Sequence, residues 1–187
     1  MKDVIKVSTV AFNAKWGEKE RNLNRMAGYI ETAASEGSNI IIFPEMGLTG
    51  YDDEEDKPKL EKMQYKLAET VPGKSSEVIA ELTKKLGIYA VFGLPERDPD
   101  DESKIYNAAC VCGPDGIVGS YHKIHLPYPE PHWASRGTAP FIFDTEWGPI
   151  GLGICYDTYS FPELMRYYAA KGCRLYINCT ALAKCHG

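Results

Sequence analysis

The hydrophobic pattern of the chain alternates between two periods from its first residues onward. Residues 3–12 are rich in β-branched side chains and predict a strand. Residues 18–36 place apolar side chains at helical spacing and stop at Gly37, which predicts a helix. Residues 39–43 form a continuous apolar run, typical of a strand covered on both faces. This strand–helix–strand order predicts a right-handed crossover that makes the two strands parallel.

The middle of the chain predicts two further helices and three strands. We expect the helices at residues 58–69 and 75–86, and a strand at 88–92. Residues 104–112 and 117–126 predict two more strands. These two strands should form a hairpin, because the Gly-Pro-Asp-Gly sequence between them is a strong turn signal.

A proline-rich segment at residues 127–140 separates these elements from the last part of the chain. Its four prolines exclude a central strand, and an irregular segment of this length is typical of a binding loop. The remaining residues predict a second hairpin, a helix and a final strand, at 141–145 with 149–155, at 161–171 and at 174–178. We therefore predict one α/β domain over residues 1–187.

Composition and charge narrow the class of protein. A chain of 187 residues with 44% hydrophobic and 25% charged residues can bury a core as one soluble domain. A net charge of -5 gives no electrostatic reason to bind nucleic acid or an anionic membrane. The N-terminus has no apolar signal core, and no apolar run approaches the length of a membrane span. We expect a cytoplasmic protein without a nucleic-acid or membrane partner.

The six cysteines favour reduced thiols over a disulfide framework or a metal site. A chain of this size without a secretion signal is expected in a reducing compartment. Cys110 and Cys112 lie two apart and can pack on one face of a strand. Cys173, Cys179 and Cys185 lack the paired spacing of zinc ligands, so we expect no metal.

Cys155 occupies a position where α/β proteins present reactive groups. It ends the apolar run Ile150–Ile154, and a helix is expected soon after it, because Ser160 and Glu163 have the spacing of a capping box. Ligands and reactive groups of open α/β sheets gather at such strand ends. Free cysteine is usually buried and inert, however, so the position alone does not assign a role.

Two other polar residues stand at comparable positions. Glu45 follows the strand that Pro44 ends, and Lys123 lies near the end of another apolar strand. A cysteine nucleophile needs a base, which a carboxylate can be when burial raises its pKa. The oxyanion formed on attack needs a donor, which a lysine ammonium and the backbone N–H of Tyr156 can supply. Glu45, Lys123 and Cys155 therefore make a complete set of roles.

Three stretches of the chain resemble the carbon–nitrogen hydrolase (nitrilase) superfamily. They are Ile-Ile-Phe-Pro-Glu-Met-Gly-Leu-Thr-Gly-Tyr at 41–51, Tyr-His-Lys-Ile-His-Leu at 121–126 and Gly-Leu-Gly-Ile-Cys-Tyr-Asp at 151–157. Three motifs in this order make the resemblance specific, and it covers residues 3–181. It implies an α-β-β-α sandwich that commonly pairs into a dimer, so we expect a homo-oligomer.

The resemblance also implies the roles of the site residues. Glu45 is implied as general base, Lys123 as stabiliser of the oxyanion and Cys155 as nucleophile, with no cofactor or metal. Many amidases of the family carry a second glutamate after the lysine motif, and Glu130 fits that region. A solvated loop carboxylate is the alternative for Glu130, weighed evenly. Glu130, Tyr51, Tyr156 and Trp133 are expected to contact substrate, with plain packing as the alternative for Tyr51.

The chain departs from the family at two places. It stops at Gly187, just after the strand that follows the cysteine helix, whereas the family normally continues. We therefore expect that a C-terminal part of the family domain is missing, in a fragment or in a shortened relative. The segment Thr158–Ser160 also looks longer than the common family version and would shape the pocket.

The predicted function is hydrolysis of a nonpeptide carbon–nitrogen bond in a small amide or carbamoyl amide, through a thioester on Cys155. Cys-Tyr-Asp resembles the amidase-like branches more than the Cys-Trp-Glu of nitrilases, so nitrile hydrolysis ranks second. Two further alternatives stay open. One is a Cys–His acyltransferase or protease that uses His122 or His125 as base. In the amidase interpretation, His125 would instead contact the catalytic residues without touching substrate. The other is a truncated, non-catalytic remnant.

Overall fold

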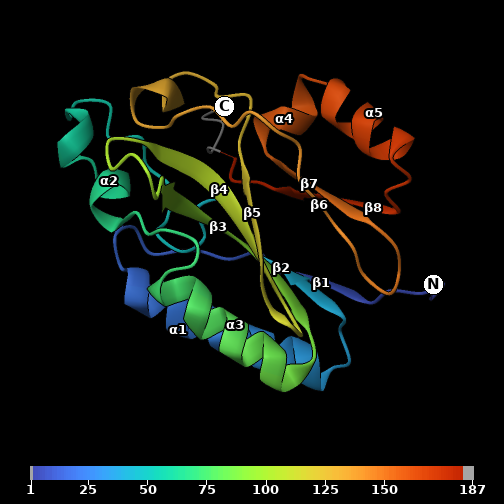
Figure 1. Cartoon of the computed structure of the whole chain (residues 1–187). Helices are drawn as coiled ribbons and strands as arrows, with labels where there is room; N and C mark the ends of the chain where they lie inside the picture. The colour runs from blue at the N-terminus through green and yellow to red at the C-terminus, as the bar shows by residue number, and fades with distance from the viewer. Residues whose placement is uncertain (1, 183–187) are drawn as a thin grey trace, which may run out of the picture.

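Two β-sheets pack face to face in the computed structural model, which describes residues 2–182 (Figure 1). Helices α1 (Lys19–Ser35) and α3 (Lys74–Leu86) lie side by side on the outer face of the larger sheet. Helix α5 (Glu163–Ala170) covers the outer face of the smaller sheet. The layers follow the order helix, sheet, sheet, helix, which confirms the predicted α-β-β-α sandwich.

The larger sheet contains five strands in chain order. They are β1 (Val7–Thr9), β2 (Ile40–Ile42), β3 (Tyr89–Arg97), β4 (Ile105–Gly113) and β5 (Gly116–His122). Strands β1, β2 and β3 are parallel, and β3, β4 and β5 are antiparallel. The predicted parallel pairing of β1 and β2 is confirmed, and so is the hairpin, which Gly113 and Gly116 close as a pair.

The smaller sheet contains three strands in the order β6 (Ile142–Phe143), β7 (Ile150–Ile154) and β8 (Leu175–Cys179). Strand β6 is antiparallel to β7, and β8 is parallel to it. Two glycines of β7, Gly151 and Gly153, leave space for tyrosine rings to pack directly against the strand. A Cβ at Gly151 would lie 2.5 Å from Cγ of Tyr168, and one at Gly153 would lie 1.8 Å from the Tyr176 hydroxyl oxygen. The two glycines therefore let α5 and β8 pack closely.

The alternation of side chains along the strands divides the core in two. Ile41 and Phe43 face the helices α1 and α3, whereas Ile40 faces the smaller sheet. Cys110 and Cys112 share the helix-facing side of β4, as expected. Val91 and Val111 join Ile40 in the layer between the sheets. This inter-sheet layer holds the strand ends of both sheets in fixed relation.

Several element boundaries differ from the predicted ones. The helix expected at 58–69 is a 3₁₀ turn η1 (Lys59–Glu61) followed by α2 (Met63–Leu67). Lys62 is extended between them, at φ −64° and ψ 144°, and its buried ammonium donates to the carbonyl oxygen of Asp53 at 2.6 Å. Strand β1 is also much shorter than residues 3–12.

The expected capping box of Ser160 and Glu163 is wrong. A short helix α4 (Tyr156–Tyr159) starts directly after Cys155, and Ser160 closes it. Helix α5 begins after Pro162, without a side-chain cap. The proline-rich segment contains a 3₁₀ turn η2 (Glu130–His132).

Candidate active site

The backbone that carries Glu45 crosses over strand β3 at a glycine. A Cβ at Gly93 would lie 2.3 Å from the Met46 nitrogen and 2.7 Å from the Pro44 carbonyl oxygen. The Leu48 N–H donates to the Gly93 carbonyl at 3.0 Å and fixes the crossing. Because position 93 has no side chain, the carboxylate of Glu45 can turn inward just after the end of β2. Glu45 as a whole residue is 2% exposed.

Lys123 lies between two buried carboxylates. Its Nζ is 2.7 Å from Oε1 of Glu45 and 2.9 Å from Oε2 of Glu130. Lys123 follows strand β5, and its N–H donates to the Asn107 carbonyl at 2.9 Å. Glu130 is fully buried, so the alternative of a solvated loop carboxylate is wrong.

Asn107 joins the two carboxylates from strand β4. Its Nδ2 donates to Oε1 of Glu45 at 2.8 Å and also to Oε1 of Glu130. Asn107 was not among the expected site residues, although a polar side chain within the otherwise apolar 104–112 run is a signal for it. Two carboxylates, one ammonium and one amide thus form a connected buried cluster.

The charges in this cluster shift one another's pKa values. Burial alone would lower the pKa of Lys123, but the charges of Glu45 and Glu130 offset it and raise that pKa above its usual value. Burial raises the pKa of Glu130, against the lowering effect of Lys123. The lysine is therefore a fixed cation at neutral pH.

Cys155 sits in a strained turn between β7 and α4. Its backbone has φ 45° and ψ −101°, a conformation that costs a non-glycine residue about 1–3 kcal/mol. Its N–H donates to the Cys179 carbonyl at 3.0 Å. Burial, and next the charge of Glu45, raise the pKa of the thiol to about 12, although Lys123 acts in the opposite direction. The resting side chain is therefore a neutral thiol that needs a base.

One cavity of about 360 Å³ brings these groups together. Glu45, Lys123 and Cys155 all contribute to its wall, together with Tyr51, Asp52, Asp53, Pro127, Ala181 and Leu182. The Ala181 N–H donates to Oε2 of Glu45 at 3.0 Å, so the segment after β8 also holds this carboxylate. A ligand in the cavity would meet a thiol, a carboxylate and an ammonium at once.

The expected substrate-binding residues have different placements. Tyr51 lines the cavity, and its hydroxyl donates to Oε1 of Glu130 at 3.1 Å. Trp133 is 1% exposed and lies behind the wall, where its indole N–H donates to Oδ1 of Asp53 at 2.8 Å. Asp53, in the acidic run of residues 52–56, was not among the expected site residues. Burial raises the pKa of its carboxyl group.

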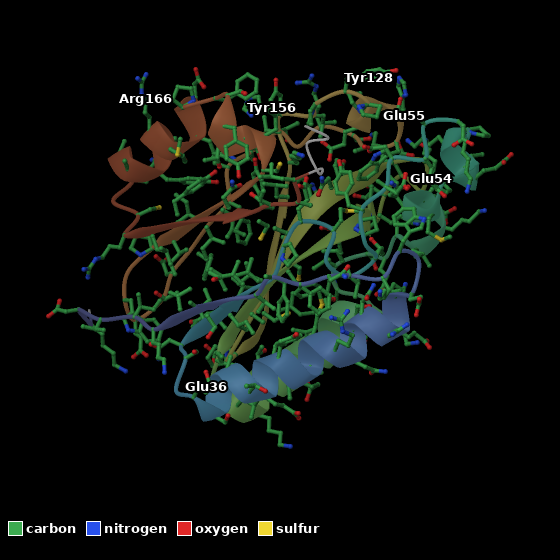
Figure 2. The ribbon with its side chains drawn as sticks, turned by 180° about the vertical axis from the view of Figure 1, so that it is seen from behind. Glu36, Glu54, Glu55, Tyr128, Tyr156 and Arg166 are labelled. Atoms are coloured by element: carbon green, nitrogen blue, oxygen red, sulfur yellow. The ribbon has the colours of Figure 1, made fainter. Side chains whose placement is uncertain are left out.

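Tyr156 begins α4 directly after Cys155, and its ring is half-buried. It packs edge-on against Phe161, with 5.3 Å between ring centroids. Figure 2 shows Tyr156 on the same edge of the molecule as Tyr128, which lies on the loop after β5. Tyr156 is not among the residues of 2–182 that form the cavity wall.

Neither histidine near Lys123 contacts the thiol. Nδ1 of His125 lies 2.8 Å from Oδ1 of Asp157, and its ring stacks on Phe161. Nε2 of His122 lies 3.1 Å from Oε2 of Glu96. Within the described part of the chain, Cys155 has no histidine partner, and the geometry gives no support to a Cys–His pair.

The structure also describes the other cysteines and the helices. Its five described cysteines are free thiols, and residues 2–182 contain no cluster of side chains suited to a metal. Cys185 and His186 lie outside these residues. None of the helices in the same range is long and apolar enough to cross a membrane.

Two curated proteins are similar to this chain in sequence. A protein named omega-amidase NIT2-B from Xenopus laevis is 35% identical over 170 residues, which cover 85% of this chain and 57% of the relative. A protein named nitrilase from Pyrococcus abyssi is 33% identical over 171 residues, 90% of this chain and 62% of the relative. The chain therefore spans about three fifths of the length of these curated relatives.

A solved structure supports the same relationship. Nit3 of Saccharomyces cerevisiae, a member of branch 10 of the nitrilase superfamily, superposes with a TM-score of 0.83 at 30% identity. The superposition covers 96% of this chain and 65% of Nit3. The family model described as carbon-nitrogen hydrolase matches residues 6–186. This chain belongs to the carbon-nitrogen hydrolase family.

Proposed function

We propose that the protein hydrolyses the carbon–nitrogen bond of a small amide through a thioester on Cys155. The observation that carries this proposal is that the thiol, the Glu45 carboxylate and the Lys123 ammonium line one cavity. A neutral thiol beside a buried carboxylate fits a reaction in which the base takes the proton during attack.

In the first half of the proposed cycle, Glu45 takes the proton of the Cys155 thiol while sulfur adds to the amide carbon. The resulting oxyanion is stabilised by the Lys123 ammonium and by the backbone N–H of Tyr156. The C–N bond then breaks, the nitrogen takes the proton from Glu45, and ammonia or an amine leaves. The acyl group remains on sulfur as a thioester.

In the second half, Glu45 takes a proton from water, and the hydroxide formed in this way adds to the thioester carbon. The C–S bond breaks, the proton returns from Glu45 to sulfur, and the carboxylic acid leaves. Lys123 faces the oxyanion again in this step. The proposed cycle uses the chain's own groups and needs no cofactor or metal.

Glu130 and Tyr51 support this machinery in the proposal. Glu130 holds the second side of Lys123, and its bond from Tyr51 brings the tyrosine to the cavity wall. We assign Trp133 an indirect role through Asp53, because its ring does not reach the wall. The ring of Tyr156 also lies outside the wall, so we propose that Tyr156 acts through its backbone N–H rather than through its ring.

The substrate class is proposed as an amide or carbamoyl amide. Relatives named omega-amidase support this class, and the relative named nitrilase makes a nitrile the second candidate. A nitrile would use the same thiol and ammonium, because sulfur adds to its carbon in the same way. We propose further that the protein is a cytoplasmic homodimer. Its free thiols fit a reducing compartment, and light scattering would test the dimer.

The test uses the full-length protein, assayed for ammonia release with small aliphatic amides, carbamoyl amines and nitriles. Wild-type protein should release ammonia from an amide, and intact-mass measurement during turnover should show the acyl group on Cys155. The variant Cys155→Ala is the control and should release none. Turnover by Cys155→Ala at the wild-type rate would overturn the proposal.

A further inference from the structure

Asp157 is a fully buried carboxylate two residues after Cys155. Its Oδ2 accepts the Tyr121 hydroxyl at 2.8 Å and the Ile154 N–H at 3.1 Å. Its Oδ1 accepts the His125 N–H at 2.9 Å and lies 2.8 Å from Nδ1 of the same residue. With a proton on that ring nitrogen, four donors fill the acceptor sites of the carboxylate.

No lysine or arginine within residues 2–182 pairs with this buried charge. Hydrogen bonds therefore replace the water that the carboxylate loses on burial. Such an arrangement tolerates little change, because the loss of any one donor leaves a buried acceptor site without a hydrogen bond and costs stability. The Asp157 side chain is thus held in one position by four donor groups from three residues.

The four donors come from one strand of each sheet and from the segment after β5, and they flank both proposed reacting groups. Ile154 is the last residue of β7 and directly precedes Cys155. Tyr121 and His125 lie two residues before and two residues after Lys123. One carboxylate therefore ties the peptide ahead of the thiol to the segment on each side of the ammonium.

The backbone of Cys155 requires such support. Its φ of 45° is a conformation that non-glycine residues adopt only when their surroundings hold it. The bond from the Ile154 N–H to Asp157 fixes the peptide before the turn, and the bond from the Thr158 N–H to the Cys155 carbonyl, at 3.0 Å, fixes the peptide after it.

We propose that Asp157 is a positioning residue that sets the Cys155 sulfur relative to Lys123 and Glu45. The inference rests on the proposed function, in which these groups react together. Asp157 itself is not among the described residues that line the cavity, so it acts through the turn and the lysine segment. A misplacement on the order of 1 Å is enough to slow such a reaction about a hundredfold.

The first test compares Asp157→Asn with Asp100→Asn in the full-length protein. The amide keeps the size of the side chain, but its nitrogen is a donor that faces donors, so at least one bond is lost. We expect kcat to fall about a hundredfold for Asp157→Asn, with KM within about threefold of wild type. Alkylation of Cys155 by iodoacetamide should slow as well. The exposed Asp100 provides a matched change that should alter neither measurement.

A second pair keeps the inference testable if Asp157→Asn does not fold. His125→Ala removes the ring donor, whereas His125→Asn places an amide N–H near the position of Nδ1. We expect the alanine variant to lose at least about tenfold in kcat and the asparagine variant to recover most of that loss. Equal kcat values for the two variants and wild type would overturn the inference, whatever their melting temperatures.

Alkylation separates this inference from the proposed function. Selective labelling of Cys155 in a wild-type protein that hydrolyses no amide would contradict the proposed function, and the variants would still be compared by labelling rate. Wild-type labelling rates in both Asp157→Asn and His125→Ala would overturn the positioning role even if the amidase activity is found. A uniform loss of folded protein, without a change in kcat per folded molecule, would also overturn it.

Discussion

The ammonium of Lys123 lies 2.7 Å from the carboxylate of Glu45, and both side chains are 1% exposed. Glu130 contacts the same ammonium from a second side. A buried ion cluster of this kind is stable as a set, since removal of one member leaves the others without compensation. The proposed chemistry and the stability of the fold therefore depend on the same contacts.

Lys123→Met should abolish turnover and destabilise the fold. The substitution removes the cation that faces the proposed oxyanion and leaves two carboxylates buried together. We expect a loss of about 3–5 kcal/mol in the free energy of unfolding, the usual cost of breaking a buried pair. Urea denaturation, monitored by circular dichroism, measures this loss.

The double variant Lys123→Met with Glu130→Gln is the control for this prediction. Because the glutamine carries no charge, the double variant should be more stable than Lys123→Met alone while its activity stays absent. A double variant that is no more stable than Lys123→Met would contradict the view that charge compensation is the cause.

Glu45→Gln should lower kcat by about two to four orders of magnitude, the span expected for a positioned general base. The amide keeps the shape of the side chain but cannot take the thiol proton. His125→Asn is the matched comparison and should have a mild effect. Steady-state kinetics on both variants measure the difference. Normal turnover in Glu45→Gln together with inactive His125→Asn would favour a Cys–His mechanism.

Cys155→Ala and Cys155→Gly should both be inactive yet differ in stability. Alanine keeps the strain of the left-handed backbone, whereas glycine adopts a φ of 45° freely. We expect the glycine variant to be more stable than the alanine variant by about 1 kcal/mol, since relief of strain exceeds the entropic cost of glycine. Thermal melts of the two variants compare them directly, and a less stable glycine variant would show that the turn is not strained.

The pH dependence of alkylation should show that the thiol is neutral at rest. In Glu45→Gln the burial of Cys155, the largest cause of its raised pKa, remains, although the charge of Glu45 is gone. The alkylation rate of Cys155 in this variant should rise about tenfold per pH unit between about pH 7 and pH 9, in proportion to the fraction of Cys155 that is thiolate. Wild-type protein should react faster at pH 7, because Glu45 assists. A plateau near pH 7 in the variant would instead indicate a preformed thiolate.

The contribution of Glu130 to the stability of the fold should fall as the pH rises above 4.5, the ordinary pKa of a glutamate side chain. Burial raises the pKa of this group in the folded state, so the native protein keeps the proton to a higher pH than the unfolded chain. The unfolded chain then releases the proton first, which favours unfolding across that window. Glu130→Gln cannot titrate, so the stability of wild type relative to this variant should fall with rising pH. A constant difference between the two would contradict the raised pKa.

Local patterns predicted the order of the elements well, because each depends on neighbours in the chain. The turn at residues 113–116 and the apolar run at 39–43 determine their own structure through short-range sterics and burial. The helix expected at 58–69 failed for the opposite reason. Lys62 leaves the helical conformation and donates to the Asp53 carbonyl across a loop, and the local pattern contains no sign of that contact.

The candidate site was predictable in its residue types but not in its connections. The strand-end positions of Glu45, Lys123 and Cys155 indicated groups that could meet, because the ends of neighbouring strands gather at one edge. The burial of Glu130 is a property of the tertiary structure, so the sequence alone left two interpretations equal. The role of Asn107 as a link between carboxylates, and that of Asp157 between sheets, follow only from distances.

The division of the site between the two sheets has a consequence for the order in which reactivity arises during synthesis. Strands β1 to β5, with Glu45 and the segment that leads to Lys123, are complete by residue 122, before any strand of the smaller sheet emerges from the ribosome. Cys155 arrives later, directly after β7, and joins Lys123 in the wall of one cavity only when the second sheet docks. A nascent or half-folded chain therefore lacks the cavity that Glu45, Lys123 and Cys155 line together, so the proposed chemistry requires that the second sheet has docked.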